Sequence, residues 1–315
     1  MNQFNHIGDL SSIPTWTSLH VLAAAVQQLC PKEQVNPGIV PGLKFFRLSK
    51  PDAPHRSFYE PCIAVILSGV KRVMFDGEEM LFHPGDFFVT SIDIPTSAHV
   101  VEASPDDCYV SMIMKIDTAR LHDLARQMQF SGAEGAAHTR GVAAGRASEE
   151  LLFAFKRLID LENRPGDIPL LADAIKSEIY VRLLQSDVGL WVSLMASDGY
   201  KAAGVVKALE WLKINYGQTL RIGNLAELSG MAVSTFHHNF RHLTGTSPLR
   251  YQKTLRLYAA RNLMLTERIT ANSAAARVGY DSVQQFSREY SRMFGAPPKR
   301  DVESTRRGDA AAATT

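Results

Sequence analysis

Residues 225–248 read LAELSGMAVSTFHHNFRHLTGTSP, and residues 274–298 read AAARVGYDSVQQFSREYSRMFGAPP. The two stretches repeat one pattern, with an offset of 49 positions before an internal turn and of 50 after it. An internal repeat of this kind indicates that one supersecondary unit occurs twice. The matched positions keep their residue type: Ala226 with Ala275, Gly230 with Gly279, Val233 with Val283, Phe236 with Phe286, Phe240 with Tyr290, Gly245 with Gly295 and Pro248 with Pro298.

Each unit predicts a helix, a tight turn and a second helix. Gly230 and Gly279 stand where the first helix must end, and glycine accepts the left-handed backbone of such a turn at little cost. The aromatic residues of each pair are four positions apart, so both face the core and the remaining polar positions of the helix face outward. Candidate N-caps of the second helices are Ser234 in the first unit and Asp281 and Ser282 in the second.

The outward positions carry hydroxyl, amide, imidazole and guanidinium groups, which hydrogen-bond to base edges or phosphates. In the major groove Arg pairs with guanine and Gln with adenine, at about 1–3 kcal/mol of discrimination per good bidentate contact. Between the units, Pro248–Thr266 predicts one helix of roughly 27 Å. Such a helix can hold two recognition helices near one DNA turn apart, about 34 Å. The basic residues of this helix either contact DNA phosphates or form a solvated face, and their place between two DNA-reading units favours phosphate contact.

The charged residues are distributed unevenly, with a change of sign just before the repeat. Residues 199–300 hold 15 Lys and Arg against 5 Asp and Glu, whereas residues 1–198 hold 17 against 24. A basic module behind an acidic one indicates two modules with different partners. The basic module has the sign needed to bind double-stranded DNA.

Residues 199–300 resemble the DNA-binding domain of AraC/XylS-type regulators, on the strength of LAELSG at 225–230, AARVGY at 275–280 and the ending FGAPP at 294–298. The resemblance implies base contacts from the second helix of each unit, at Ser234, His237, His238, Gln284 and Arg288. We expect phosphate contacts from Arg241 by the same resemblance, and from the remaining outward or spacer positions Thr235, Gln285, Arg292 and Arg256.

The N-terminal part of the chain has a different residue pattern. Between residues 39 and 116, short runs rich in β-branched and aromatic residues alternate with turn signals, which predicts an antiparallel sandwich or barrel. Apolar spacing predicts helices over residues 16–29, 117–130, 148–161, 167–185 and 191–196. Ser148 is the candidate N-cap of the third of these helices. Residues 1–15 are predicted to form a loose arm, and residues 131–146 a flexible loop. The apolar faces of the later helices either pack on the barrel or form a homodimer contact.

Four short motifs in this region resemble the N-terminal domain of one AraC-type subgroup: YEP at 59–61, SGVK at 68–71, PGD at 84–86 and SIDIP at 91–95. The resemblance implies a cupin-like barrel with a small-molecule effector pocket inside it. Tyr59 and His99 are the candidate effector-binding residues.

The chain is thus predicted to be an α+β multidomain protein. A cupin-like antiparallel β-barrel with flanking helices spans residues 16–116, and a helical, potentially dimerising region spans 117–198. An all-α domain with two helix-turn-helix motifs joined by a linker helix spans 199–300, and a disordered tail spans 301–315.

Other functions find less support. His55 and His83 are isolated, and Cys30, Cys62 and Cys108 lack metal-ligand spacing, so we expect no metal, no cofactor and no catalytic residue. The alternatives are a metal-dependent cupin enzyme fused to a DNA-binding domain, an alkyl-transfer repair regulator and a nonspecific architectural binder. Without a signal peptide or a run of about 20 apolar residues, we expect a cytoplasmic protein that does not span a membrane. The prediction is a sequence-specific transcription activator that senses a small molecule and contacts RNA polymerase.

Overall fold

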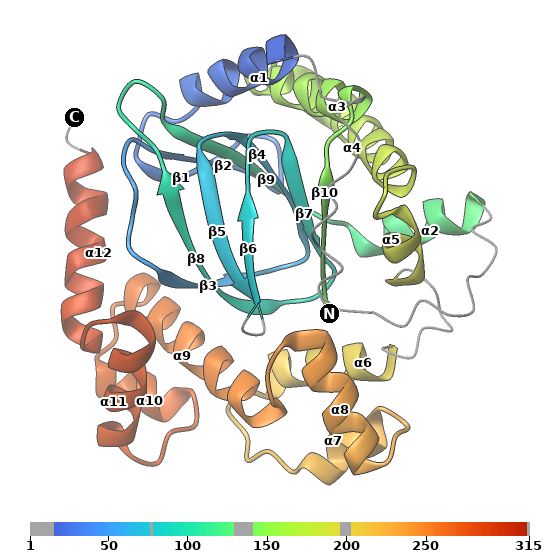
Figure 1. Ribbon diagram of the computed structural model, residues 1–315. Coiled ribbons are helices and arrows are strands. Elements are labelled where there is room, and N and C mark those ends of the chain that lie inside the picture. Colours follow the sequence, from blue (N-terminus) through green and yellow to red (C-terminus); the bar gives the residue numbers. More distant parts are fainter. Residues whose placement is uncertain (1–15, 76–77, 129–140, 196–202, 314–315) are drawn as a thin grey trace.

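The computed structural model describes residues 16–75, 78–128, 141–195 and 203–313. A β-barrel with helices packed on one side forms the N-terminal half, and a row of further helices lies against another side of the barrel (Figure 1). The α+β multidomain class predicted from the sequence is confirmed. The predicted arm over residues 1–15 lies outside the described residues.

Two antiparallel sheets face each other to form the barrel. The larger has the strand order β1-β2-β9-β4-β7-β10 and the smaller has the order β3-β8-β5-β6. The strands are β1 (Gln34–Pro37), β2 (Leu43–Leu48), β3 (His55–Tyr59), β4 (Cys62–Ser68), β5 (Val70–Phe75), β6 (Glu78–Phe82), β7 (Asp86–Thr90), β8 (Ile94–Glu102), β9 (Tyr109–Lys115) and β10 (Val142–Arg146).

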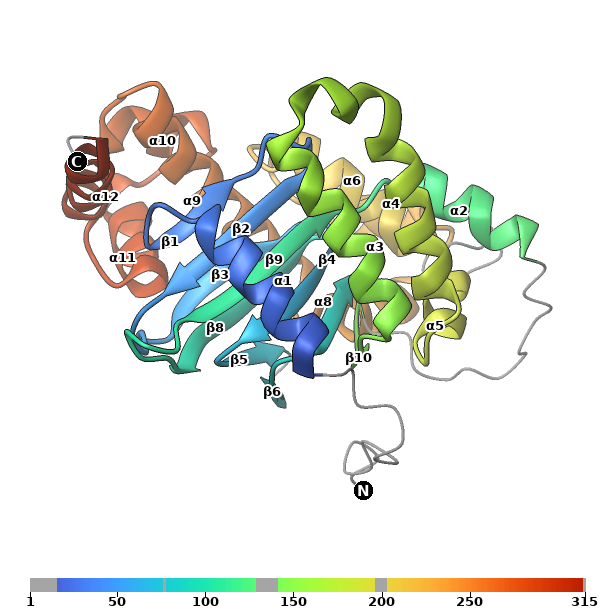
Figure 2. The same ribbon diagram turned by 90° about the horizontal axis from the view of Figure 1, so that it is seen from above.

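The central strands of the larger sheet, β9, β4 and β7, are buried on both faces. In β4, Ile63 and Val65 face the covering helices, while Ala64 and Ile66 face the barrel interior. The outer face is covered by α1 (Trp16–Gln28), α3 (Glu149–Asp160) and α4 (Ile168–Leu184), which cross it as one layer (Figure 2). The apolar faces of α3 and α4 therefore pack on the barrel, which was one of the two alternatives for these helices.

The flexible loop predicted over residues 131–146 is wrong where the structure describes it. Residues 142–146 form β10, which pairs antiparallel with β7 and extends the larger sheet. Small residues are needed here because a Cβ on Gly145 would lie 3.1 Å from the Phe87 ring. The barrel thus reaches past its predicted boundary at residue 116. Ser148 caps α3 as predicted, and its side chain accepts a hydrogen bond from the Leu151 N–H.

Two further helices, α2 (Thr118–Gln127) and α5 (Gly189–Met195), lie beside α4 on the barrel side, and the helices after them build the second half. After α6 (Ala203–Asn215), the first helix-turn-helix motif consists of α7 (Ile222–Leu228) and α8 (Val233–Thr244). The spacer α9 has the predicted bounds, Pro248–Thr266, and leads to the second motif, α10 (Ala271–Arg277) and α11 (Val283–Phe294).

The disordered tail predicted after residue 300 is wrong up to residue 313. A final helix, α12 (Pro298–Ala313), covers these residues. Its Asp301 carboxylate accepts hydrogen bonds from the Arg261 guanidinium and the Tyr290 hydroxyl, each at 2.7 Å. Arg306 donates to the Met264 carbonyl, and Val302 is buried. The helix is thus part of the second motif's core.

We expect Asp301→Ala to lower the free energy of unfolding by about 2–4 kcal/mol, because it leaves a half-buried guanidinium and a buried hydroxyl without their acceptor. Urea denaturation of the full chain measures this change. Lys299→Ala on the same helix is the control: its side chain is 86% exposed, its ammonium lies 4.0 Å from the Glu303 carboxylate, and its loss should cost about 0.5 kcal/mol or less. A small effect at both positions would argue against docking of α12.

Candidate nucleic-acid interface and ligand cavity

The second helix of each motif has one buried face and one exposed face. In α8, Phe236, Phe240 and Leu243 are buried; in α11, Phe286 and Tyr290 are buried. All nine candidate DNA-contact residues on these two helices are exposed: Ser234, Thr235, His237, His238 and Arg241 on α8, and Gln284, Gln285, Arg288 and Arg292 on α11. The structure brings each group together on one helix face, and the individual base and phosphate contacts stay predictions.

The turns follow the predicted geometry. Gly230 and Gly279 have φ values of +65° and +84°, so both stand in the left-handed region. Ser282 caps α11 and accepts a hydrogen bond from the Gln285 N–H at 3.2 Å. The first motif differs from its prediction, because α8 begins after Ala232 and Ser234 therefore lies inside its first turn. This placement leaves the Ser234 hydroxyl exposed at the start of the helix.

Glu289 anchors the side chain of one candidate residue. Its carboxylate accepts hydrogen bonds from the Lys253 ammonium and the Tyr280 hydroxyl, both at 2.8 Å, and from the Gln285 amide at 3.1 Å. Burial alone would raise the pKa of Glu289, but these three hydrogen bonds outweigh it and lower the pKa. Gln285 is thus held against a carboxylate that stays charged.

The prediction that Arg256 contacts phosphate does not agree with the structure. Its guanidinium donates to the backbone carbonyls of Tyr216, Gln218 and Gly279 at 2.7–3.0 Å. These bonds lie between the two motifs, and each of the three guanidinium nitrogens donates at least one of them. A basic residue on an amphipathic helix looks the same in sequence whether its partner is a phosphate or a carbonyl.

The barrel and the first motif share one apolar core. Phe75, Ile92 and Ile94 of the barrel belong to the same buried cluster as Phe236 and Tyr251 of the DNA-binding half. Polar contacts cross the same boundary: the Tyr251 hydroxyl donates to the Asp93 carbonyl at 3.0 Å, and the buried Asp93 carboxylate pairs with Lys213. The first motif is therefore fixed to the barrel.

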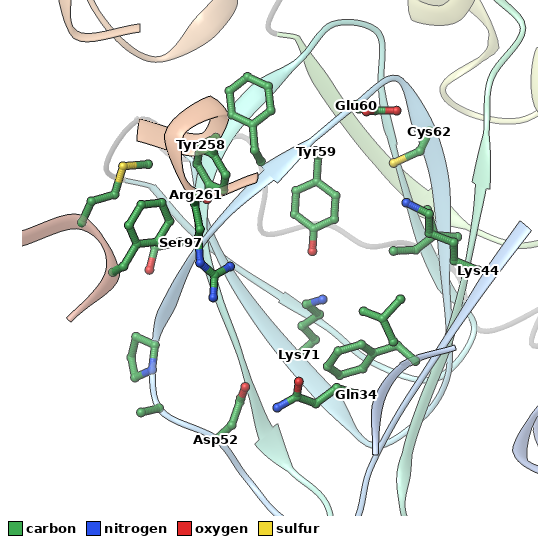
Figure 3. Close-up of a pocket in the computed structure, with 18 of the residues that line it drawn as sticks. Gln34, Lys44, Asp52, Tyr59, Glu60, Cys62, Lys71, Ser97, Tyr258 and Arg261 are labelled. Atoms are coloured by element: carbon green, nitrogen blue, oxygen red, sulfur yellow. The ribbon is translucent and has the colours of Figure 1, made fainter. Parts of the chain in front are cut away.

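The second motif meets the barrel across a cavity of about 930 Å³. The cavity runs from the barrel interior to α9, α11 and the start of α12 (Figure 3). Tyr59 and Lys71 reach into it from the barrel, and Arg261 reaches into it from α9. Its other polar or charged lining residues include Lys44, Asp52, Glu60, Ser97, Arg292 and Asp301.

Lys71 is the most unusual residue of this cavity. Its side chain is only 8% exposed, and its ammonium lies 5.4–5.9 Å from the ring centroids of Phe46, Tyr59 and Tyr109. Aromatic rings attract a cation at such distances. Within the described chain, Lys71 makes no hydrogen bond or ion pair with a side-chain carboxylate. An anion entering the cavity would supply the missing counter-ion.

Of the two predicted effector-binding residues, Tyr59 lines the cavity and His99 does not. In β8, Ala98 and Val100 face the barrel core, so the alternation of the strand turns His99 to the outer face. Sequence reasoning missed Lys71, although it shares the inward period of β5 with Val73 and Phe75. It also missed Arg261, whose position depends on the packing of α9 against the barrel.

Two observations bear on the alternative functions. No three His, Cys, Asp or Glu side chains lie together as a metal site in the parts of the chain that the structure describes. None of the helices described is both long and apolar enough to cross a lipid bilayer.

Comparison with known proteins gives matches over both halves. A family described as "AraC-type transcriptional regulator N-terminus" matches residues 39–190, and a "Helix-turn-helix domain" family matches residues 225–303. The HTH-type transcriptional activator RhaS of Yersinia pestis (strain Pestoides F) is 27% identical over 255 residues, which cover 79% of this chain and 88% of RhaS.

Solved structures of ToxT from Vibrio cholerae have a similar fold. ToxT of strain SCE256 with a bound unsaturated fatty acid has a TM-score of 0.59 at 11% identity, covering 82% of this chain and 94% of ToxT. ToxT of strain O395 bound to (E)-4-(8-methylnaphthalen-1-yl)but-3-enoic acid has a TM-score of 0.61 at 13% identity, covering 82% and 97%. At such identities the likeness concerns the fold alone.

Proposed function

This chain belongs to the AraC-type family of DNA-binding transcription regulators and is not an enzyme, and from this we propose that it binds a specific DNA sequence and activates transcription in response to an anionic small molecule. Activation is the part that RhaS supports, since that relative is a transcriptional activator. The proposal includes contact with RNA polymerase at the promoter and action in the cytoplasm.

One observation carries the proposal of sequence-specific binding. Two helices expose the side chains predicted to read bases on one face and bury aromatic residues on the other, and a single helix joins the two motifs. Nonspecific binding needs positive charge alone, whereas the exposed faces of α8 and α11 also hold Ser, His and Gln, which read base edges. A monomer therefore carries two reading elements.

Selection of binding sequences from random double-stranded DNA with the full chain tests this proposal. We expect recovery of two short conserved boxes near one helical turn apart. Recovery of unrelated sequences, with affinity that depends on salt alone, would instead indicate an architectural binder.

Arg288→Ala is expected to relax the sequence preference at one position of one box, by about 5- to 150-fold, because a bidentate contact with guanine contributes about 1–3 kcal/mol of discrimination. Titrations of single-base variants of the selected site measure the effect. Arg241→Ala on α8 is the matched control: we expect equal weakening for all sequences and a salt slope reduced by about 1. Equal weakening by Arg288→Ala would reassign that residue to phosphate.

For the effector, we infer a small apolar acid bound in the cavity between barrel and second motif. The nearly buried Lys71 ammonium among three aromatic rings, without a carboxylate partner in the described residues, favours an anionic group at that point. A volume of about 930 Å³ suits a ligand of metabolite or drug size. The two ToxT ligands are carboxylic acids, which agrees with this choice.

A homodimer stays a prediction. The buried faces of α3 and α4 are used by the barrel, but Phe153 on α3 and Leu170 on α4 are 55% and 78% exposed. Light scattering of the full chain, alone and on its selected DNA, tests for a dimer.

A further inference from the structure

Arg256 lies in the middle of α9, the helix that joins the two motifs (Figure 1). Its Nε donates to the Tyr216 carbonyl at 2.7 Å, and its Nη2 donates to the carbonyls of Gln218 at 3.0 Å and Gly217 at 3.4 Å. Its Nη1 donates to the Gly279 carbonyl at 2.7 Å. Residues 216–218 lead into the first motif, and Gly279 is the turn of the second. One side chain therefore bonds to both motifs.

The neighbouring contacts strengthen this connection. Gln252, one turn earlier on α9 and 2% exposed, donates to the carbonyls of Tyr216 and Gln218 at 2.9 and 2.7 Å. The Arg256 guanidinium also lies over the Tyr280 ring, 5.8 Å from its centroid. The two motifs touch beside these bonds, since a Cβ on Gly279 would lie 2.1 Å from the Gly217 carbonyl oxygen.

A connecting helix alone would leave the two motifs free to turn about its ends. The bonds of Arg256 and Gln252 close a ring of contacts from α9 to the loop of the first motif and the turn of the second. Guanidinium suits this role because its five donors lie in one rigid plane and it keeps its charge at every physiological pH. Every bond goes to a main-chain carbonyl, so the geometry of the backbone itself is held.

We propose that Arg256 is a positioning residue that sets the separation and rotation between α8 and α11, and thereby the spacing between the two DNA boxes that the chain accepts. The inference rests on the proposed binding to two boxes. Each added base pair turns one box about 34–36° around the DNA axis relative to the other. A rigid pair of recognition helices cannot follow such a turn, whereas a loosened pair can.

The test compares the selected two-box site with variants that carry one or two extra base pairs between the boxes. For the unaltered chain we expect a loss of affinity of about 100-fold or more, because one of the two reading helices loses its bases. For Arg256→Ala we expect a loss below about 10-fold and a selection that recovers the same boxes at several spacings. Arg256→Lys should be intermediate, since one ammonium has three donors.

Arg250→Ala is the matched control. Arg250 is exposed on the same helix, and its guanidinium makes no hydrogen bond to either motif within the described chain. Its loss removes the same charge, so we expect weaker binding with the strict spacing retained. If Arg256→Ala does not fold by circular dichroism, Gln252→Ala replaces it, because it removes two bonds of the same ring.

The outcomes separate the inference from its premise. An unaltered chain that recovers no two-box sequence overturns the proposed function. A two-box sequence whose spacing stays equally strict in the folded Arg256→Ala or Gln252→Ala chain overturns the inference. A drop in the salt slope of about 1 for Arg256→Ala, with strict spacing, would return Arg256 to phosphate contact.

Discussion

Gly279→Ala is expected to abolish binding to the second DNA box and to lower the free energy of unfolding by about 3–5 kcal/mol, whereas Gly230→Ala is expected to cost about 1 kcal/mol. The two glycines occupy matched positions of the internal repeat and share a left-handed backbone, at φ +84° and +65°. An alanine therefore carries a similar conformational cost at both positions.

The difference arises from the surroundings of the two turns. A Cβ at Gly279 would lie 2.1 Å from the carbonyl oxygen and 2.9 Å from the carbonyl carbon of Gly217, and neither backbone atom can move without shifting the loop. At Gly230 no heavy atom lies within 4 Å of the added Cβ. The second turn would have to separate from the first motif, and the alignment of α11 with α8 would be lost.

Urea denaturation and titration with two-box and single-box DNA measure both effects. Gly230→Ala serves as the internal control for backbone strain, so the difference between the two variants isolates the contact with Gly217. Equal costs at both glycines would contradict the contact between the motifs. If the Gly279→Ala chain is destabilised but still requires both boxes at the original spacing, the contact between Gly279 and Gly217 does not align α11 with α8 on the DNA.

Lys71→Met is expected to weaken binding of carboxylic acids by about 10- to 150-fold, because it removes the ammonium that lies among the rings of Phe46, Tyr59 and Tyr109. A charged contact made in a buried site contributes about 1.5–3 kcal/mol. Methionine is one heavy atom shorter but keeps an unbranched apolar side chain, so the three rings retain a packing partner. Without ligand, the variant should be at least as stable as the original chain, since a buried ammonium without a carboxylate is unfavourable.

Thermal unfolding of the full chain with an unsaturated fatty acid, with (E)-4-(8-methylnaphthalen-1-yl)but-3-enoic acid and with the methyl esters of both provides the measurement. An acid present at 100 times its Kd stabilises the folded chain by about 2.7 kcal/mol. The esters have nearly the same shape without charge and should have little effect. Lys44→Met, at an exposed position of the cavity wall, is the control and should keep the response to acids.

Two results would contradict the anionic effector. If acids and esters raise the melting temperature equally, the apolar wall of the cavity recognises the ligand. If Lys71→Met retains the full response to acids, the anion lies beside Arg261 or Arg292 instead.

The tandem motifs and their spacer could be predicted from the sequence because their signals are local. Glycines at fixed positions, aromatic residues four apart and a serine or proline at a helix start act within a few residues, and they placed α9 within its observed bounds. Runs of β-branched and aromatic residues between turn signals also predicted most of the barrel strands. The alternation of inward and outward residues in β5 would have placed Lys71 inside the barrel.

The errors concern contacts between residues far apart in the chain. Strand β10 reads VAAGR, and its three central residues are small ones that disfavour a strand; it forms because β7 offers an edge and Gly145 fits beside Phe87. Helix α12 is polar along much of its length, and it docks because Asp301 meets Arg261, 40 positions away. The bonds of Arg256 likewise depend on a loop 38–40 positions before it.

The shared core of Ile92, Ile94, Phe236 and Tyr251 has a consequence for how the chain can be divided. Cutting between residues 195 and 203 would separate two segments of sequence but would also split one cooperative folding unit. A C-terminal fragment would expose to water the apolar side chains that the barrel now covers, and the barrel fragment would expose its complement. The bonds of Arg256 and Gln252 in turn tie the second motif to the first. The division of the sequence before α6 is therefore not a boundary for folding.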